Sequence, residues 1–365
     1  MSLAREGYDV RQFEPGDGAA VASLYETVFG DERTERWFDW KFRENPFVDH
    51  VPITLAVDPD DGVVGARPMF ALPMAVGRTE FLALQPCDAM VHPDHRRQGL
   101  FTRMTERAID RYDDHEAALF FNFPNEQSAA GNRKLGWRDV GALTTYYRVQ
   151  SPRAWVDPDG GVETVAATAV DVVATGYLRA RDALAPSVEG VTIARRPEPP
   201  AELLASLYRS AVPTGFHSVR NEAYVRWRYR NPRWSYRTYV ARDDADRPLA
   251  AAVVGRKSAG GTTAVRLTDV VPTPPDEGSL AALLAAVLSD NRDADAVAAP
   301  PCLPGELLAR FGFHPDTELP LSLAGSATIH VARPATVDAD DWTLFGRSVT
   351  DADNWALTFG EQDTS

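Results

Sequence analysis

An arginine-rich turn is the part of this sequence whose residue types and spacing most clearly suggest chemistry. Residues 91–101 read Val-His-Pro-Asp-His-Arg-Arg-Gln-Gly-Leu-Phe, and an apolar-periodic segment then runs from Gly99 to Tyr112. The periodicity predicts a helix. Backbone amides at a helix start are unpaired and lie at the positive end of the helix dipole, so they attract anions. Glycine lets a phosphate approach the backbone closely, and Arg96 and Arg97 add positive charge. The turn therefore predicts a phosphate-binding loop.

The predicted neighbouring elements would hold this loop in place. Phe81–Val91 reads as a strand, in which Pro86 predicts a bulge or an edge position. Leu119–Phe121 reads as a buried strand, and a short helix then leads to the block Asn132–Trp137. A final pair of strands is predicted within Asp139–Val149. These elements predict a sheet with the loop at the end of one central strand.

This order of elements resembles the GNAT superfamily of acetyltransferases. Their coenzyme A loop reads Arg/Gln-x-x-Gly-x-Gly/Ala after a strand ending in Val-x-Pro, and residues 91–99 follow that pattern. Phe101 departs from it, but the enhanced-intracellular-survival branch is similar in having larger apolar residues and Thr there, as in Leu100-Phe101-Thr102. The block Asn132–Trp137 resembles the family's Tyr-x-x-Leu-Gly-Phe. The resemblance covers about residues 8–150.

The resemblance implies an N-acetyltransferase that binds acetyl-CoA as a co-substrate and uses no metal. An amine would attack the thioester directly, without a covalent enzyme intermediate. Backbone amides near the end of the central strand would pair with the pantetheine arm and polarise the thioester carbonyl. The residues expected to bind the coenzyme are Met90, Val91, Arg96, Arg97, Gln98, Gly99, Leu100, Phe101, Thr102 and Asn125.

The groups that move protons are less well defined. Family members often protonate the leaving thiolate with a tyrosine where this chain has Asn132, and an amide can position a thiol but cannot give up a proton at neutral pH. Tyr146 is a candidate for that acid; alternatively, it packs in a sheet. Asp88 is a candidate base on the strand face opposite Val91; alternatively, it is an edge carboxylate. The weaker candidates are Tyr147, His92, His95 and Glu126.

The chain also contains a degenerate tandem repeat. Val10–Tyr25 and Val191–Tyr208 share a strand, a turn and a helix ending Ala-Ser-Leu-Tyr, and Trp40–Pro46 is echoed by Trp227–Pro232. The paired Trp motifs would either line an acceptor groove or pack the fold, and their presence in both copies favours packing. The expected organisation is a GNAT domain at 1–150, a connector with a helix at 151–190, a degenerate GNAT-like domain at 191–334 and an acidic tail at 335–365.

The second copy has a loop of the same spacing but opposite charge. Pro272 to Gly278 matches Pro93 to Gly99, but three residues replace the Arg-Arg-Gln of the first loop, namely Pro275, Asp276 and Glu277. Carboxylates repel a diphosphate, and proline has no amide hydrogen to donate. We therefore expect one coenzyme site, in the first copy, with the second copy structural or shaping the acceptor pocket.

The composition restricts the partners. The formal net charge is -14, and only Lys41, Lys134 and Lys257 are lysines, an acidic pattern similar to that of proteins from salt-loving archaea. Such a surface disfavours nucleic acid and anionic membranes. Two cysteines in no CxxC spacing and no exported-protein signal favour the cytoplasm.

The expected fold class is α/β (α+β), with two tandem GNAT-like domains, each a mixed, mostly antiparallel twisted sheet flanked by helices. Two alternative functions stay open. One is an acyl-CoA-binding sensor without turnover; the other is an aminoacyl-tRNA-dependent transferase, which the acidic charge disfavours. The identity of the amine acceptor and the oligomeric state are not predicted.

Overall fold

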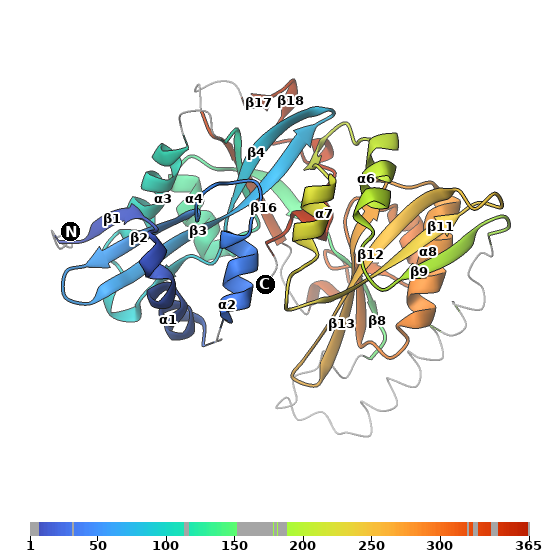
Figure 1. The fold of residues 1–365 in the computed structure, drawn as a ribbon, viewed down its shortest axis with the longest axis horizontal. Coiled ribbons are helices and arrows are strands. Elements are labelled where there is room, and N and C mark those ends of the chain that lie inside the picture. Colours follow the sequence, from blue (N-terminus) through green and yellow to red (C-terminus); the bar gives the residue numbers. More distant parts are fainter. Residues whose placement is uncertain are drawn as a thin grey trace.

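The computed structural model describes residues 7–30, 33–112, 117–151, 188–319, 321–323, 328–336 and 342–363, together with Leu178 and Arg181. They form two bodies side by side, each a twisted sheet with helices against it (Figure 1). The predicted α/β class with two mixed, mostly antiparallel sheets is confirmed. The helix expected around residues 165–181 lies outside the described residues, except for Leu178 and Arg181. None of the described helices is both long and apolar enough to cross a membrane.

The first sheet has the strand order β1-β2-β3-β4-β6-β16-β7, with β5 and β10 also paired to β3. Among its described strands, β4 and β6 pair in parallel, and the other strand pairs are antiparallel. The bounds are β1 Asp9–Gln12, β2 Ile53–Asp58, β3 Gly62–Val76, β4 Thr79–Pro86, β5 Met90–Val91, β6 Leu119–Asn122, β7 Arg138–Leu143, β10 Phe216–Ser218 and β16 Thr328–Pro334.

Helices cover both faces of this sheet because β3 is apolar on both sides. Phe70 and Leu72 belong to the same core cluster as residues of α1 and α2, whereas Met69 and Ala71 belong to the cluster that includes Ala108 of α3. This is the alternation expected of a strand buried on both faces. The helices and 3-10 or π turns of this body are η1 Pro15–Asp17, α1 Gly18–Phe29, α2 Glu35–Phe38, η2 Asp39–Arg43, η3 Pro93–His95, α3 Leu100–Arg111 and α4 Glu126–Lys134.

The second sheet repeats the first, element by element. From its β9 edge the order is β9-β11-β12-β13-β14-β8-β15, and α8 lies after β13 as α3 lies after β5. The strand bounds are β8 Tyr146–Val149, β9 Thr192–Arg196, β11 Ser235–Arg242, β12 Pro248–Ala259, β13 Thr262–Val271, β14 Ala296–Ala299 and β15 His314–Pro315. The helices are α6 Ala201–Ser210, α7 Glu222–Arg228, α8 Glu277–Asp290 and α9 Gly305–Arg310, followed by the 3-10 turn η5 Leu321–Leu323.

Each copy contributes one strand to the sheet of the other. β8, which follows β7 in the chain, pairs with β14 and β15 of the second sheet. β16, from the end of the second copy, lies between β6 and β7 of the first. The prediction that Asp139–Val149 forms a strand pair within the first domain is therefore wrong, because its two strands belong to different sheets. A division of the chain near residue 150 would leave each sheet without one of its inner strands.

The repeated Trp motifs meet at the seam between the two copies. The Trp40 and Trp227 rings stack with centroids 6.2 Å apart. Trp40 Nε1 donates to the Trp227 carbonyl (2.9 Å), and Trp227 Nε1 donates to the Trp40 carbonyl (2.8 Å). This reciprocal contact has the local two-fold symmetry expected of a duplicated unit. The structure thus supports the packing interpretation of both motifs.

The C-terminal segment crosses this seam. It comprises β17 Thr343–Leu344, β18 Arg347–Ser348, η6 Ala352–Asn354 and η7 Phe359–Glu361, and its last described residues lie between α2 and α7 (Figure 1). Arg220 is buried between Asp269 of β13 (3.0 Å) and Glu361 of the tail (2.8 Å). Trp355 packs on Phe216 with ring centroids 4.6 Å apart. The described part of the tail is therefore an internal connection between the copies.

Candidate functional site

The predicted phosphate loop joins β5 to α3 and leaves the helix start open. Gly99 is the N-cap of α3 at φ 74°, and no side chain caps the helix. No acidic residue occupies the first turn. Arg97 also has a left-handed φ of 63°. Loops of this shape turn successive amides toward one point, and the exposed Arg96 and Arg97 side chains flank it. The arrangement suits a bound anion.

A buried histidine, His95, holds this loop against the first sheet. His95 contacts the Tyr8 hydroxyl through Nδ1 (3.0 Å) and Asp61 through Nε2 (3.2 Å). Both ring nitrogens are thus engaged in holding the turn. His92 accepts a hydrogen bond from the backbone amide of Asp94 (3.4 Å). These contacts give both histidines a structural role in shaping the loop.

The corresponding loop of the second copy is closed by its own carboxylate. Asp276 caps α8, and its side chain accepts a hydrogen bond from the Ser279 amide at 2.8 Å. Glu277 adds a second acid in the first turn and pairs with Arg310 at 2.9 Å. An anion at this helix start would have to displace Asp276 and approach two negative charges. The predicted contrast between the two loops agrees with this geometry.

The strand leading to the open loop is broken next to the sheet centre. β4 pairs with β6 only at Ala83 and Leu84, and the chain then leaves this ladder before β5 pairs with β3. Asp88, in the break, has a left-handed φ of 41°. The edge of β5 turned away from β3 has no partner strand among the described residues. The prediction of one continuous strand over Phe81–Val91 is therefore wrong: β4 ends at Pro86, and β5 begins at Met90 with one edge unpaired among the described strands.

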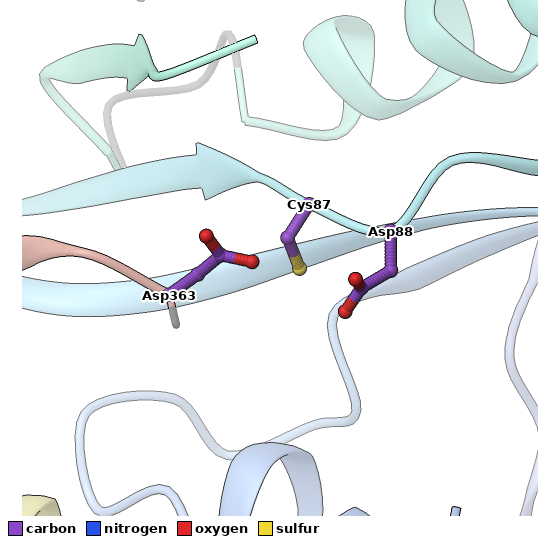
Figure 2. A group of neighbouring side chains, drawn as sticks. All are labelled: Cys87, Asp88 and Asp363. Carbon is purple, nitrogen blue, oxygen red and sulfur yellow. The ribbon is translucent and has the colours of Figure 1, made fainter. Parts of the chain in front are cut away.

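A compact charged cluster lies at this break, on the α1 side of the sheet. Lys41 Nζ donates to Asp88 (2.7 Å) and to Asp363 of the tail (3.2 Å), and the Tyr25 hydroxyl donates to Asp88 (2.8 Å). Cys87 and Asp88 extend from the end of the β4 arrow, and Asp363 faces them from the C-terminal segment (Figure 2). The buried Lys41 ammonium therefore pairs with two carboxylates that lie far apart in the sequence.

The two carboxylates differ in acidity. Burial opposes ionisation of Asp88, but the Lys41 ammonium outweighs it and lowers the pKa of Asp88 below its ordinary value. Burial raises the pKa of Asp363 above its ordinary value, despite the opposing effect of Lys41. The side chain of Asp363 is also more exposed, at 27% against 15% for Asp88. Asp363 is thus the better placed of the two to accept a proton.

This cluster does not fit a metal ion. Ligand atoms of Cys87, Asp88 and Asp363 lie within 4.8 Å of one another, a spacing that a metal could use. The Lys41 ammonium already supplies the positive charge between the carboxylates. Burial also raises the pKa of the Cys87 thiol well above its ordinary value, which disfavours the thiolate form that binds metals.

On the opposite face of the sheet, Asn132 is part of a second buried polar group. Its side chain is fully buried on α4 and accepts a hydrogen bond from Arg67 of β3 at 3.2 Å. Asn125 caps α4 by accepting from the Ser128 amide at 2.9 Å. Tyr146 is not near either residue: it lies in β8 and packs with the core of the second body. The structure therefore does not support Tyr146 as the acid, because strand exchange removes it from the first sheet.

The other predicted coenzyme residues follow the loop as expected, with one qualification. Arg96, Arg97, Gly99 and Thr102 are exposed at the loop, whereas Leu100 is buried in a core cluster with Met104. Leu100 can therefore offer only its backbone amide to a ligand. Sequence reasoning missed Lys41, Arg67 and Asp363, which join the site only through tertiary contacts. The rarity of lysine in this chain was the one available signal for Lys41.

A cavity of about 1250 Å³ opens between the two copies. Both copies line it: Trp40 and Glu44 from the first, and Tyr229 and Trp234 from the second. Trp40 is adjacent in sequence to Lys41, on the same turn η2.

Comparison with known proteins agrees with this architecture. Residues 9–140 match the sequence profile of the acetyltransferase (GNAT) domain family. No protein in a search of curated sequences matches the chain.

Solved structures share the fold over most of the chain. A GCN5-related N-acetyltransferase from Anabaena variabilis aligns with a TM-score of 0.60 at 11% identity, covering 90% of this chain and 73% of its own. A GCN5-related N-acetyltransferase from Kribbella flavida aligns with a TM-score of 0.55 at 14% identity, covering 90% and 71%. Eis1 from Mycobacterium abscessus aligns with a TM-score of 0.50 at 13% identity, covering 90% and 73%.

The first copy therefore matches a GNAT acetyltransferase domain over residues 9–140, and this match together with the shared fold supports an acyltransferase. The two sheet bodies agree with a tandem of such folds.

Proposed function

We propose that the protein transfers the acetyl group of acetyl-CoA to an amine by direct attack, at a single site in the first copy. The observation that carries the proposal is the difference between two helix starts of one chain. The start of α3 is uncapped and flanked by Arg96 and Arg97, whereas the start of α8 is capped by Asp276. An open, positive helix start suits a diphosphate, and a capped, negative one does not.

The coenzyme then runs from the loop toward the strand break. Its phosphates accept hydrogen bonds from the amides between Arg96 and Thr102, and its pantetheine arm pairs with the free edge of β5 at Met90 and Val91. Asn125, the N-cap of α4, lines the other side of this path, and Asn132 is buried on the same helix. The acyl end reaches the break in the strand near Asp88, where an amine can approach from the opposite, α1 side.

The charged cluster on the α1 side supplies the proton acceptor. Asp88 is engaged by Lys41 and Tyr25, whereas Asp363 is partly exposed and has a raised pKa. The amine nitrogen forms a bond to the thioester carbonyl carbon, the carbon–sulfur bond breaks, and its electron pair stays on sulfur. The ammonium proton passes to Asp363, directly or through a water.

Release of free coenzyme A thiol, measured with a panel of amines, tests the proposal. We expect acceptor-dependent release that falls by about 10²- to 10⁴-fold in Asp363→Asn, because a positioned general base contributes that much. The dissociation constant for coenzyme A should not change. Asp353→Asn, an exposed change in the same tail, is the matched control. Tight coenzyme binding without release for any amine would contradict the enzyme and indicate an acyl-CoA sensor. Binding of aminoacyl-tRNA instead of the coenzyme would contradict both.

A further inference from the structure

Beneath the open loop lies a buried guanidinium with no carboxylate partner among the described residues. Arg67 is 2% exposed, and its Nη2 donates a hydrogen bond to Asn132 Oδ1 at 3.2 Å. Its guanidinium carbon also lies 4.8 Å from the centre of the Phe101 ring, at the start of α3. Arg67 therefore sits between β3, α3 and α4, on the face of the sheet where the loop begins.

Both members of this pair keep a donor unused. The Nε of Arg67 and the Nδ2 of Asn132 are buried without a hydrogen-bond partner among the described residues. Leaving a buried donor unpaired costs about 1–3 kcal/mol, and more for a charged group. These two donors, on hydrogen-bonded side chains next to the open loop, are available to an acceptor from outside the chain.

The second copy shows that the fold does not need this polar pair. Leu308 corresponds to Asn132, since both carbonyls accept from the residues three and five positions later at the end of their helices. Met90 and Asp269 each lie three residues before the loop proline and pair with Ala66 and Val253, so Val254 corresponds to Arg67. Val254 and Leu308 are both buried in the hydrophobic core of the second body. The copy with a closed loop has an apolar pair where the copy with an open loop has Arg67 and Asn132.

We propose that Arg67, oriented by Asn132, binds the sulfur of coenzyme A and stabilises the thiolate that leaves when the carbon–sulfur bond breaks. The inference rests on the proposed acetyl-CoA function and adds the group that receives the leaving electron pair. No side chain protonates the leaving group in this step. The amine proton goes to Asp363, and the thiolate, once released from the acyl carbon, is paired with the guanidinium. This also explains how Asn132 can occupy the end of α4 without acting as an acid.

Arg67 has the charge that this role requires. Burial lowers its pKa to about 10, so it is still protonated at neutral pH. The nearby Cys87 thiol is neutral, because burial raises its pKa. The positive charge of Arg67 is therefore not neutralised by its neighbours before the coenzyme binds. An opposite charge within about 4–6 Å lowers the pKa of an acid by roughly 1–3 units.

The thiol pKa of coenzyme A bound to the intact protein tests the inference without turnover. Ultraviolet absorbance of the thiolate, followed against pH with saturating protein, should show that binding lowers the thiol pKa by at least about one unit. Arg67→Met should return it to the value of free coenzyme A, and Arg67→Lys should keep most of the shift. Val254→Met, the matched change in the second copy, should leave the shift intact. Desulfo-coenzyme A should bind equally to the native protein and Arg67→Met.

The outcomes separate this inference from the proposed function. Coenzyme A that binds the native protein with an unshifted thiol pKa would overturn the role of Arg67 and leave the coenzyme site standing. A shift that persists in a folded Arg67→Met would overturn it equally. Failure of the native protein to bind coenzyme A would reject the proposed function itself. If Arg67→Met does not fold, the native measurement and Arg67→Lys still decide.

Discussion

The two copies of this fold differ where a ligand would touch them and agree where they touch each other. At the seam, Trp40 and Trp227 make the same stacked, reciprocal contact. At the loops, the open start of α3 contrasts with the start of α8, which Asp276 closes. Both copies thus keep the packing contact at the seam, whereas only the first has an uncapped helix start at its loop.

The cation that follows each seam tryptophan differs in the same way. Lys41 holds two carboxylates, Asp88 and Asp363. Arg228, its counterpart, is equally buried but donates to backbone carbonyls of the tail at Phe359, Gly360 and Gln362. Lys41 thus pairs with carboxylates near the strand break, whereas Arg228 binds the backbone of the C-terminal tail. The comparison predicts different responses to loss of each cation.

The largest effect is expected from Lys41→Met. Removing one partner of a buried ion pair leaves an uncompensated charge and costs about 3–5 kcal/mol. Without the ammonium, the folded-state pKa of Asp88 rises above its unfolded value and that of Asp363, already raised, rises further, so the folded state of the variant binds more protons than that of the native protein. The loss of stability should therefore grow as pH rises above the ordinary aspartate pKa of 3.8 and shrink as pH falls toward it.

Urea unfolding of Lys41→Met and Arg228→Met across pH 4–8 measures this difference. Arg228→Met leaves carbonyls, not carboxylates, without a donor, so its destabilisation should depend much less on pH. Equal pH dependence in the two variants would refute the distinction between the cations.

A smaller effect, about 100-fold in the dissociation constant of coenzyme A, is expected for Arg96→Glu combined with Arg97→Glu. The double change replaces two positive side chains at the phosphate site with negative ones, and each charged hydrogen bond is worth about 1.5–3 kcal/mol. Gly99→Val should also weaken binding, by more than about tenfold, because a side chain is strained at φ 74°. Isothermal titration calorimetry measures both. Gly278→Ala, at the matching position of the second loop, should bind as the native protein does.

The smallest effect concerns the closed loop itself. Asp276→Ala removes the side chain that accepts from Ser279 and should cost about 1 kcal/mol of stability, whereas Asp276→Ser should retain the cap. Neither change should alter the affinity for coenzyme A, since that site lies in the first copy. Thermal unfolding and calorimetric titration of the two variants provide the measurements. A new coenzyme site in Asp276→Ala would mean that this one carboxylate is all that separates the loops.

Local pattern determined much of this protein. The arginines, the glycine and the helix period around Gly99 predicted the open helix start, and Asp276 and Glu277 predicted the closed one. Both depend on residues a few positions apart, within reach of one turn of backbone. The duplication could also be recognised in the sequence, because the two Trp motifs retain their residues and order.

Only the tertiary structure decided which strand joins which sheet and which distant residues meet. The sequence predicted strands within Asp139–Val149, but not that β8 and β16 exchange between the sheets. Pairing between strands so far apart in the chain depends on what each sheet edge leaves open. That exchange removed Tyr146 from the site. The contacts of Lys41 with Asp363, across 322 positions, and of Arg67 with Asn132, across 65, arise from the same long-range assembly. The sequence by itself determined which helix start is open and positively flanked; the folded chain decided which distant charged side chains lie near it.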